Sequence, residues 1–178
     1  HATTEGGGLA INGDGSYHVE RSWFAANDAG VDGGAIVLRD VDDAGSDLRN
    51  NRIQDNVAQA GGGGIAVLGA TGALRIVNNT LTGNLADGGE GGGLLVDVAL
   101  GSALEVSGNV LHSNDGASAL FVSPGSGARV SYNTAYLGNS GVHYGGEVGD
   151  GAGAPLEPTN RVRNPDLVSI SDDADPDN

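Results

Sequence analysis

The stretch SWFAANDAGVDGGAIVL, residues 22–38, places an aromatic pair, an asparagine and a glycine pair in front of a short apolar run. The same order returns three times further along the chain. The later copies are RIQDNVAQAGGGGIAVL at 52–68, TLTGNLADGGEGGGLLV at 80–96 and VLHSNDGASALFV at 110–122. Self-similarity at a regular period is typical of repeat architectures, in which each repeat packs on its neighbours.

Two columns of polar residues define this repeat. The column that comes later in each copy, called the second column, follows an apolar residue at intervals of 25 to 30 residues. Its members are Asn27, Asn56, Asn84, Asn114 and Asn139. The first column lies a few residues earlier in each copy and consists of Ser22, Asn51, Asn79, Asn109 and Asn133.

Short apolar runs separated by asparagine or glycine occur three to a repeat. None of them keeps a helical period for three turns, and glycine interrupts throughout, so helices are excluded. The pattern predicts an all-β fold, a right-handed parallel β-helix (solenoid) of about six coils with three short strands per coil. Coils stacked ~4.8 Å apart would let the amides of each asparagine column hydrogen-bond along the stack. Asparagine and glycine also tolerate the left-handed backbone conformation that corners require.

The two ends of the chain differ in character. We expect the coils to occupy residues 1–148, and the Pro/Gly/Asp-rich segment 149–178, which holds four of the five prolines, to be a possible cap. Solenoids need such caps because an open last coil exposes strand edges and core side chains. The N-terminal sequence TEGGGLAI, residues 4–11, already reads as the middle of a coil. We therefore expect part of a longer protein or a subunit of a complex.

Composition excludes several classes of partner. The net charge is −15, and all eight basic residues are arginine. A surface of this sign repels nucleic acid and anionic membranes, so neither is expected as a partner. No apolar run approaches the ~20 residues that a membrane-spanning helix needs, so no membrane span is expected. The lack of cysteine excludes a disulfide scaffold and a thiolate metal site.

The repeats resemble those of right-handed parallel β-helix proteins of the pectate-lyase-like superfamily, over nearly the whole chain. FAAN followed by GGAI, within residues 24–36, is similar to the paired tetrapeptides of polymorphic outer-membrane proteins, which are adhesin-like autotransporters. NRVRNPDLVSI, residues 160–170, is similar to a segment that follows the last coils in many bacterial secreted β-helix proteins. The resemblance implies an extracellular, cell-surface or periplasmic location. The same scaffold carries lyases, hydrolases, epimerases, adhesins and structural fibres.

The residue pattern of the strand after each glycine turn predicts an apolar outer face. If Leu9, Ala35, Ile65, Leu94 and Ala119 point inward, the outward column is Ala10, Ile36, Ala66, Leu95 and Leu120. Soluble monomers rarely expose such a face over several coils, so we interpret it as an interface with a protein partner or as a self-association surface. The alternatives are a solvated face of small residues or a one-residue error in register, which would invert every assignment.

A second outward face carries alternating charges. Its two columns flank the buried Val19, Leu48, Ile76, Val106, Val130 and Val162. They are His18, Asp47, Arg75, Glu105, Arg129 and Arg161, and Glu20, Arg49, Val77, Ser107, Ser131 and Arg163. We interpret them as a charge ladder that fixes the register of the coils, in preference to a subsite for an anionic sugar. Arg161 and Arg163 break the alternation and are candidates to face a partner.

Two acidic segments are the candidates for a metal site. RDVDDAGSD offers Asp40 and Asp42, and SDDADPDN offers Asp173, Asp175 and Asp177 at alternate positions. Alternate carboxylates in a turn suit Ca²⁺, but neither segment completes a Ca²⁺ signature. Solvated loops are the preferred interpretation, so we expect no cofactor, with Ca²⁺ as the one alternative.

No catalytic constellation emerges from the sequence. The expected function is therefore a non-catalytic extracellular or cell-surface β-helix module for structural assembly or adhesion. The alternative is a carbohydrate-active β-helix, similar to a polysaccharide lyase or hydrolase, whose site lies outside the recognisable coils. Polysaccharide is thus a second possible partner class.

Overall fold

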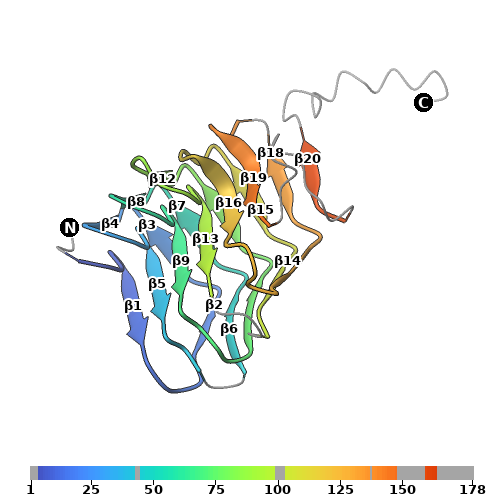
Figure 1. Cartoon of the computed structure of the whole chain (residues 1–178). Coiled ribbons are helices and arrows are strands. Elements are labelled where there is room, and N and C mark those ends of the chain that lie inside the picture. Colours follow the sequence, from blue (N-terminus) through green and yellow to red (C-terminus); the bar gives the residue numbers. More distant parts are fainter. Residues whose placement is uncertain (1–3, 43–44, 99–102, 137, 148–158, 164–178) are drawn as a thin grey trace.

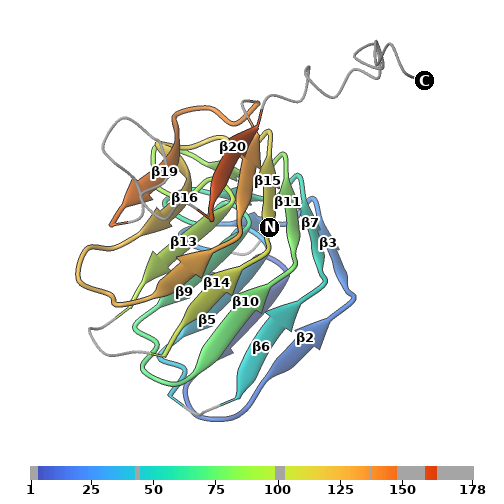
Figure 2. The same ribbon diagram turned by 90° about the vertical axis from the view of Figure 1, so that its right-hand side faces the viewer.

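The computed structural model describes residues 4–42, 45–98, 103–136, 138–147 and 159–163. The chain winds into a parallel β-solenoid of about five turns, close to the predicted six, with no helix among the described residues. The predicted fold class is confirmed. Figures 1 and 2 show the coils stacked as layers, with the chain passing from one sheet to the next around each coil.

Each coil contributes one strand to each of three main sheets, and all pairings are parallel. The first sheet consists of β1 (Leu9–Asn12), β5 (Ile36–Arg39), β9 (Ile65–Leu68), β13 (Leu94–Asp97), β16 (Ser118–Val122) and β19 (Val142–Gly146). The second consists of β2 (His18–Glu20), β6 (Ser46–Arg49), β10 (Leu74–Val77), β14 (Glu105–Ser107) and β17 (Arg129–Ser131). The third consists of β3 (Trp23–Ala25), β7 (Arg52–Gln54), β11 (Thr80–Thr82), β15 (Val110–His112), β18 (Thr134–Tyr136) and β20 (Arg161–Arg163).

A small fourth sheet was not predicted. It consists of β4 (Asp28–Ala29), β8 (Val57–Ala58) and β12 (Leu85–Ala86). These two-residue strands are too short to give an alternating pattern, which is why the sequence does not reveal them.

The interior is a stack of mainly aliphatic side chains that repeat from coil to coil. Ile53, Leu81 and Leu111 lie above one another in the third sheet, each fully buried. Leu48, Ile76 and Val106 do the same in the second sheet.

Membrane-spanning helices are absent from the described part of the chain.

Both asparagine columns form hydrogen-bonded ladders at the corners beside the third sheet. In the second ladder, Asn56 Nδ2 donates to Asn84 Oδ1 at 2.9 Å, and Asn84 Nδ2 donates to Asn114 Oδ1 at 2.8 Å. The complete ladders are Asn51, Asn79, Asn109, Asn133 and Asn160, and Asn27, Asn56, Asn84, Asn114 and Asn139. Asn160 extends the first ladder by one coil beyond the prediction.

Before every ladder asparagine except Asn139 and Asn160, the preceding residue, and not the asparagine itself, is the left-handed corner residue. Ala26 and Asp55 have φ of 54° and 55°, and they precede Asn27 and Asn56. No ladder asparagine has positive φ. This placement corrects the expectation that asparagine makes the turn. The conformation costs a residue with a Cβ roughly 1–2 kcal/mol, which the buried ladder beside it offsets.

The glycine turns are required by close backbone packing. A Cβ on Gly63 would lie within 3.0 Å of the Gly92 carbonyl oxygen and of the backbone of Leu85. Gly34 is crowded in the same way by the Gly63 carbonyl and by Val57. The turn of one coil therefore rests directly on the turn of the next, with no room for a side chain between them.

The last described strand lies within the segment predicted to be a separate cap. β20 pairs with β18, with Arg161 opposite Thr134 and Arg163 opposite Tyr136. Arg161 and Arg163 were predicted to continue the second sheet after Arg129, and that placement is wrong. Asn160 occupies a ladder position, so the residues that follow it enter the third sheet.

Candidate functional site

The outer face of the first sheet differs from the predicted apolar interface by one residue in two coils. Ile36 and Leu120 were predicted to point outward, but both are fully buried in the main core. Ala35 and Ala119 occupy the place of the third glycine of the turn, so the inward and outward positions of each strand are shifted by one residue. The outward column of these coils is Ala10, Val37, Ala66, Leu95 and Phe121.

Little of this apolar column is available to a partner. Val37 and Ala66 are only 2% and 0% exposed, and they form a small outer cluster with Leu68, against which Leu95 packs. Arg39, which follows in the same strand, is ion-paired with Glu5. Ala10 is exposed, but its side chain is small. The face is therefore a weaker candidate for an interface than the sequence predicted.

The outer face of the second sheet is a ladder of ion pairs. Arg49 Nε lies 3.0 Å from Glu20, and Arg75 Nε lies 3.2 Å from Glu105. His18 Nδ1 lies 3.1 Å from Asp47. A hydrogen bond from the Ser107 hydroxyl, at 2.7 Å, is the main cause that lowers the pKa of Glu105, and Arg75 contributes. These charges are largely satisfied by one another. The depression of about 530 Å³ beside Arg75 and Glu105 is lined by the same ladder.

The outer face of the third sheet has a different composition, and the sequence did not single it out. Its middle residues belong to the core, so the flanking residues point outward. We call this set the third-sheet face. Its members are Trp23, Ala25, Arg52, Gln54, Thr80, Thr82, Val110, His112, Thr134, Tyr136 and Arg161.

Two aromatic contacts order side chains on the third-sheet face. Trp23, the single tryptophan, is 68% exposed, and the Arg52 Cζ atom lies 5.6 Å from the centre of its ring. His112 and Tyr136 meet edge to face with ring centres 5.6 Å apart. Tyr132, the corner residue beside this face, is 69% exposed. Large aromatic rings exposed on a rigid strand are unusual in a protein that is 4% aromatic, and they suit a binding role.

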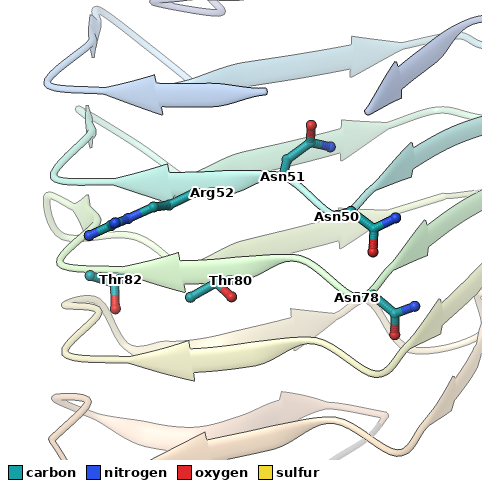
Figure 3. Close-up of a pocket in the computed structure, with 6 residues that line it drawn as sticks. All are labelled: Asn50, Asn51, Arg52, Asn78, Thr80 and Thr82. Carbon is teal, nitrogen blue, oxygen red and sulfur yellow. The ribbon is translucent and has the colours of Figure 1, made fainter. Parts of the chain in front are cut away.

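A depression of about 440 Å³ lies where the corner meets the third-sheet face. Figure 3 shows the amides of Asn50 and Asn78 at one end, Arg52 and Thr82 at the other, and Thr80 between them. Asn50 and Asn78 are exposed left-handed corner residues with φ of 56°. The remaining lining residue is Asn51, whose amide is engaged in the ladder. The depression thus presents amide, hydroxyl and guanidinium groups, which suit a hydroxyl-rich ligand.

The candidate Ca²⁺ residues receive no support as a cluster. Asp40 is a left-handed residue with φ of 52°, and its backbone N–H bonds the Leu68 carbonyl. In the parts of the chain that the structure describes, neither Asp40 nor Asp42 belongs to a group of three or more metal-binding side chains. Asp173, Asp175 and Asp177 lie outside the described residues.

Comparison with known proteins identifies the fold family alone. The family model described as "Right handed beta helix region" matches residues 2–152. No curated protein and no solved structure matches the chain. The match concerns the solenoid as a whole and does not single out autotransporters or any enzyme group.

Proposed function

Because the chain belongs to the right-handed β-helix family, whose scaffold supports both binding proteins and enzymes, we propose that it is a non-catalytic adhesion module that binds polysaccharide. Its site of action is outside the cell, at the cell surface or in the periplasm. The binding surface is the third-sheet face with the adjoining corner residues. The observation that carries this proposal is the exposed Trp23–Arg52 stack beside a depression lined by amides and hydroxyls.

The chemistry of this face suits sugar recognition. Pyranose rings present apolar faces that pack on flat aromatic rings, and hydroxyl edges that exchange hydrogen bonds with amide, hydroxyl and guanidinium groups. Trp23 supplies the flat surface, and Arg52, Thr80 and Thr82 supply hydrogen-bonding groups. All of them stand on strands of a rigid solenoid, so little ordering entropy is lost when a ligand binds.

The distribution of carboxylates supports binding over hydrolysis. Glycoside hydrolases use a pair of Asp or Glu residues that flank the scissile bond, about 5 to 9.5 Å apart. No strand of the third sheet contains Asp or Glu. Carboxylates of the second sheet, such as Glu20 and Glu105, are held in ion pairs.

Affinity electrophoresis through gels that contain single polysaccharides tests this proposal. We expect at least one polysaccharide to retard the protein, and Trp23→Ala to abolish the retardation. Val31→Ala is the matched control, because Val31 is also an exposed large apolar residue but lies outside the third sheet. Its retardation should equal that of the wild type.

Incubation of the protein with each retarding polysaccharide, followed by assays for new reducing ends and for unsaturated products, tests the non-catalytic role. We expect no product. Product formation would show that the chain is an enzyme. Unchanged retardation of Trp23→Ala would place the binding surface elsewhere on the solenoid.

A further inference from the structure

Three of the four arginines on the described strands of the first and second sheets are ion-paired, and Arg129 is the exception. Arg39, Arg49 and Arg75, on the first and second sheets, each make an ion pair with a carboxylate. Arg52 and Arg161, on the third-sheet face, make none within the described residues. Three strand-borne cations are therefore neutralised, while those of the third-sheet face remain available to an external anion.

The third sheet is also free of negative charge in a chain that carries 23 acidic residues. Its six strands contain no Asp or Glu. The two corner residues before each of the first five strands include none either; they are residues 21–22, 50–51, 78–79, 108–109 and 132–133. The nearest carboxylate in sequence, Asp55, follows β7 and accepts a hydrogen bond from Gln54 Nε2 at 2.8 Å. The strands of this face thus carry arginine but no carboxylate, with Arg21 and Asp55 next to its strands in sequence.

We propose that the depression beside Arg52 is a subsite for an oxyanion carried by the polysaccharide, a sulfate or carboxylate group on a sugar. The Arg52 guanidinium lies over the Trp23 ring and makes no ion pair within the described residues, so its N–H groups are available to donate. A guanidinium edge matches the two oxygens of a carboxylate or a sulfate. Thr80, Thr82, Asn50 and Asn78 then bond the neighbouring hydroxyl groups. This inference rests on the proposed function and names the ligand chemistry of the same site.

The spacing of the cations indicates a sparsely charged polymer that lies along the solenoid axis. Arg52 and Arg161 occupy the same outward column, through Thr80, Val110 and Thr134. Four coil steps of ~4.8 Å separate them, which gives roughly 19 Å. Double-stranded DNA carries a charge about every 1.7 Å and would meet the acidic remainder of the molecule. At physiological ionic strength the Debye length is about 8 Å, so acids on the opposite sheets are largely screened from a ligand on this face.

Dextran, dextran sulfate and carboxymethyl dextran test the inference, because they share one neutral backbone. Isothermal titration calorimetry with fragments of equal length gives the dissociation constants. We expect at least one charged form to bind about tenfold or more tightly than dextran, since a charge-assisted hydrogen bond contributes that much. The comparison of sulfate with carboxymethyl identifies which oxyanion the subsite prefers.

Variants of Arg52 locate the subsite. Arg52→Gln should lose about tenfold or more in affinity for the charged form and leave affinity for dextran unchanged. Arg52→Lys keeps the charge but not the planar guanidinium, so its affinity for the charged form should fall between those of the wild type and Arg52→Gln. Arg129→Gln, at an exposed arginine of the second sheet, is the matched control and should bind within twofold of the wild type. Circular dichroism must show that each variant has the wild-type spectrum.

Two results would overturn the inference, and they differ in what they leave standing. If all three dextrans bind equally, or if Arg52→Gln binds the charged form as the wild type does, the oxyanion subsite is wrong. Polysaccharide binding that depends on Trp23 would survive that result. If no dextran form and no polysaccharide binds, the inference and the proposed function fail together.

Discussion

Replacement of Asn84 by alanine should strongly destabilise the solenoid. Asn84 lies in the middle of the second ladder and is fully buried. Its oxygen accepts from Asn56 N and Asn56 Nδ2 at 3.2 and 2.9 Å, and its Nδ2 donates to Asn114 Oδ1 and Ile53 O at 2.8 and 3.0 Å. Four hydrogen bonds at about 0.5–1.5 kcal/mol each predict a loss of roughly 2–6 kcal/mol. That is a large share of the ~5–15 kcal/mol typical of a folded domain.

Asn27 provides a control within the same ladder. It lies in the first coil, and its side chain makes one described hydrogen bond, from Nδ2 to Asn56 Oδ1 at 2.8 Å. Asn27→Ala should therefore cost only about 0.5–1.5 kcal/mol. Urea unfolding followed by circular dichroism, with the midpoints compared at a common m-value, measures both variants.

The reasoning is refuted if the two alanine variants are equally stable. Asn84→Asp adds a second test, because it keeps the accepting oxygen but loses both donations. At neutral pH it also sets a buried carboxylate against the Ile53 carbonyl, so we expect it to be at least as destabilising as Asn84→Ala. A stable Asn84→Asp protein would show that amide donation does not hold the coils together.

Three further predictions concern stability. Gly63→Ala should destabilise by more than the ~1–3 kcal/mol of ordinary overpacking, because its Cβ would meet backbone atoms within 3.0 Å. Gly88→Ala, whose Cβ would meet nothing within 4 Å, should cost only the ~1–2 kcal/mol of its positive φ. The urea midpoints of the two variants measure the difference, and equal costs would contradict the packing argument. Tyr144→Phe should cost about 0.5–1.5 kcal/mol, because the buried hydroxyl donates its one hydrogen to the carbonyl oxygens of Asn133 and Arg161, each 3.0 Å away, and the Asn133 oxygen keeps its bond from Arg161 N. A melting temperature equal to that of the wild type would argue against it. The pKa of Glu105 is lowered by the Ser107 hydroxyl and by Arg75, so its stabilising contribution is present at neutral pH and is lost as the pH falls through its folded pKa, below the ordinary value of 4.5. Glu105→Gln should therefore flatten the loss of stability in that acid range, and an unchanged pH profile of the urea midpoint would contradict the assignment.

The repeat and its asparagine ladders could be predicted because they are the parts of the coil that every coil shares. A ladder position tolerates only a side chain that both donates and accepts along the stack, so asparagine recurs at Asn56, Asn84 and Asn114 and marks the period. The register of the first sheet was predicted wrongly in two coils, where the shared pattern is ambiguous. Ala35 and Ala119 replace a glycine of the turn, and a replacement of one small residue by another gives no sign that the register of the strand is shifted by one residue.

The third-sheet face could not be found from the repeat, because its residues differ from coil to coil. Trp23, Arg52, Thr80, Val110 and Thr134 share a column but no chemical type. The outward residues of this face therefore vary between coils, while the core and ladder residues repeat. One signal was available in the sequence: the three residues that follow Ser22, Asn51, Asn79, Asn109, Asn133 and Asn160 include no Asp or Glu in any coil, in a chain with a net charge of −15.

The central claim is that the third-sheet face binds a polysaccharide around the Trp23–Arg52 stack. Titration of the ¹⁵N-labelled protein with dextran sulfate fragments, followed by two-dimensional NMR, tests it most directly. The account predicts saturable shifts of the Trp23 indole N–H and of backbone amides in β3, β7 and β11, with none at Val37 or Ala66 of the first sheet. Shifts confined to the first sheet, or no saturable shift with any polysaccharide that the protein binds, would contradict it.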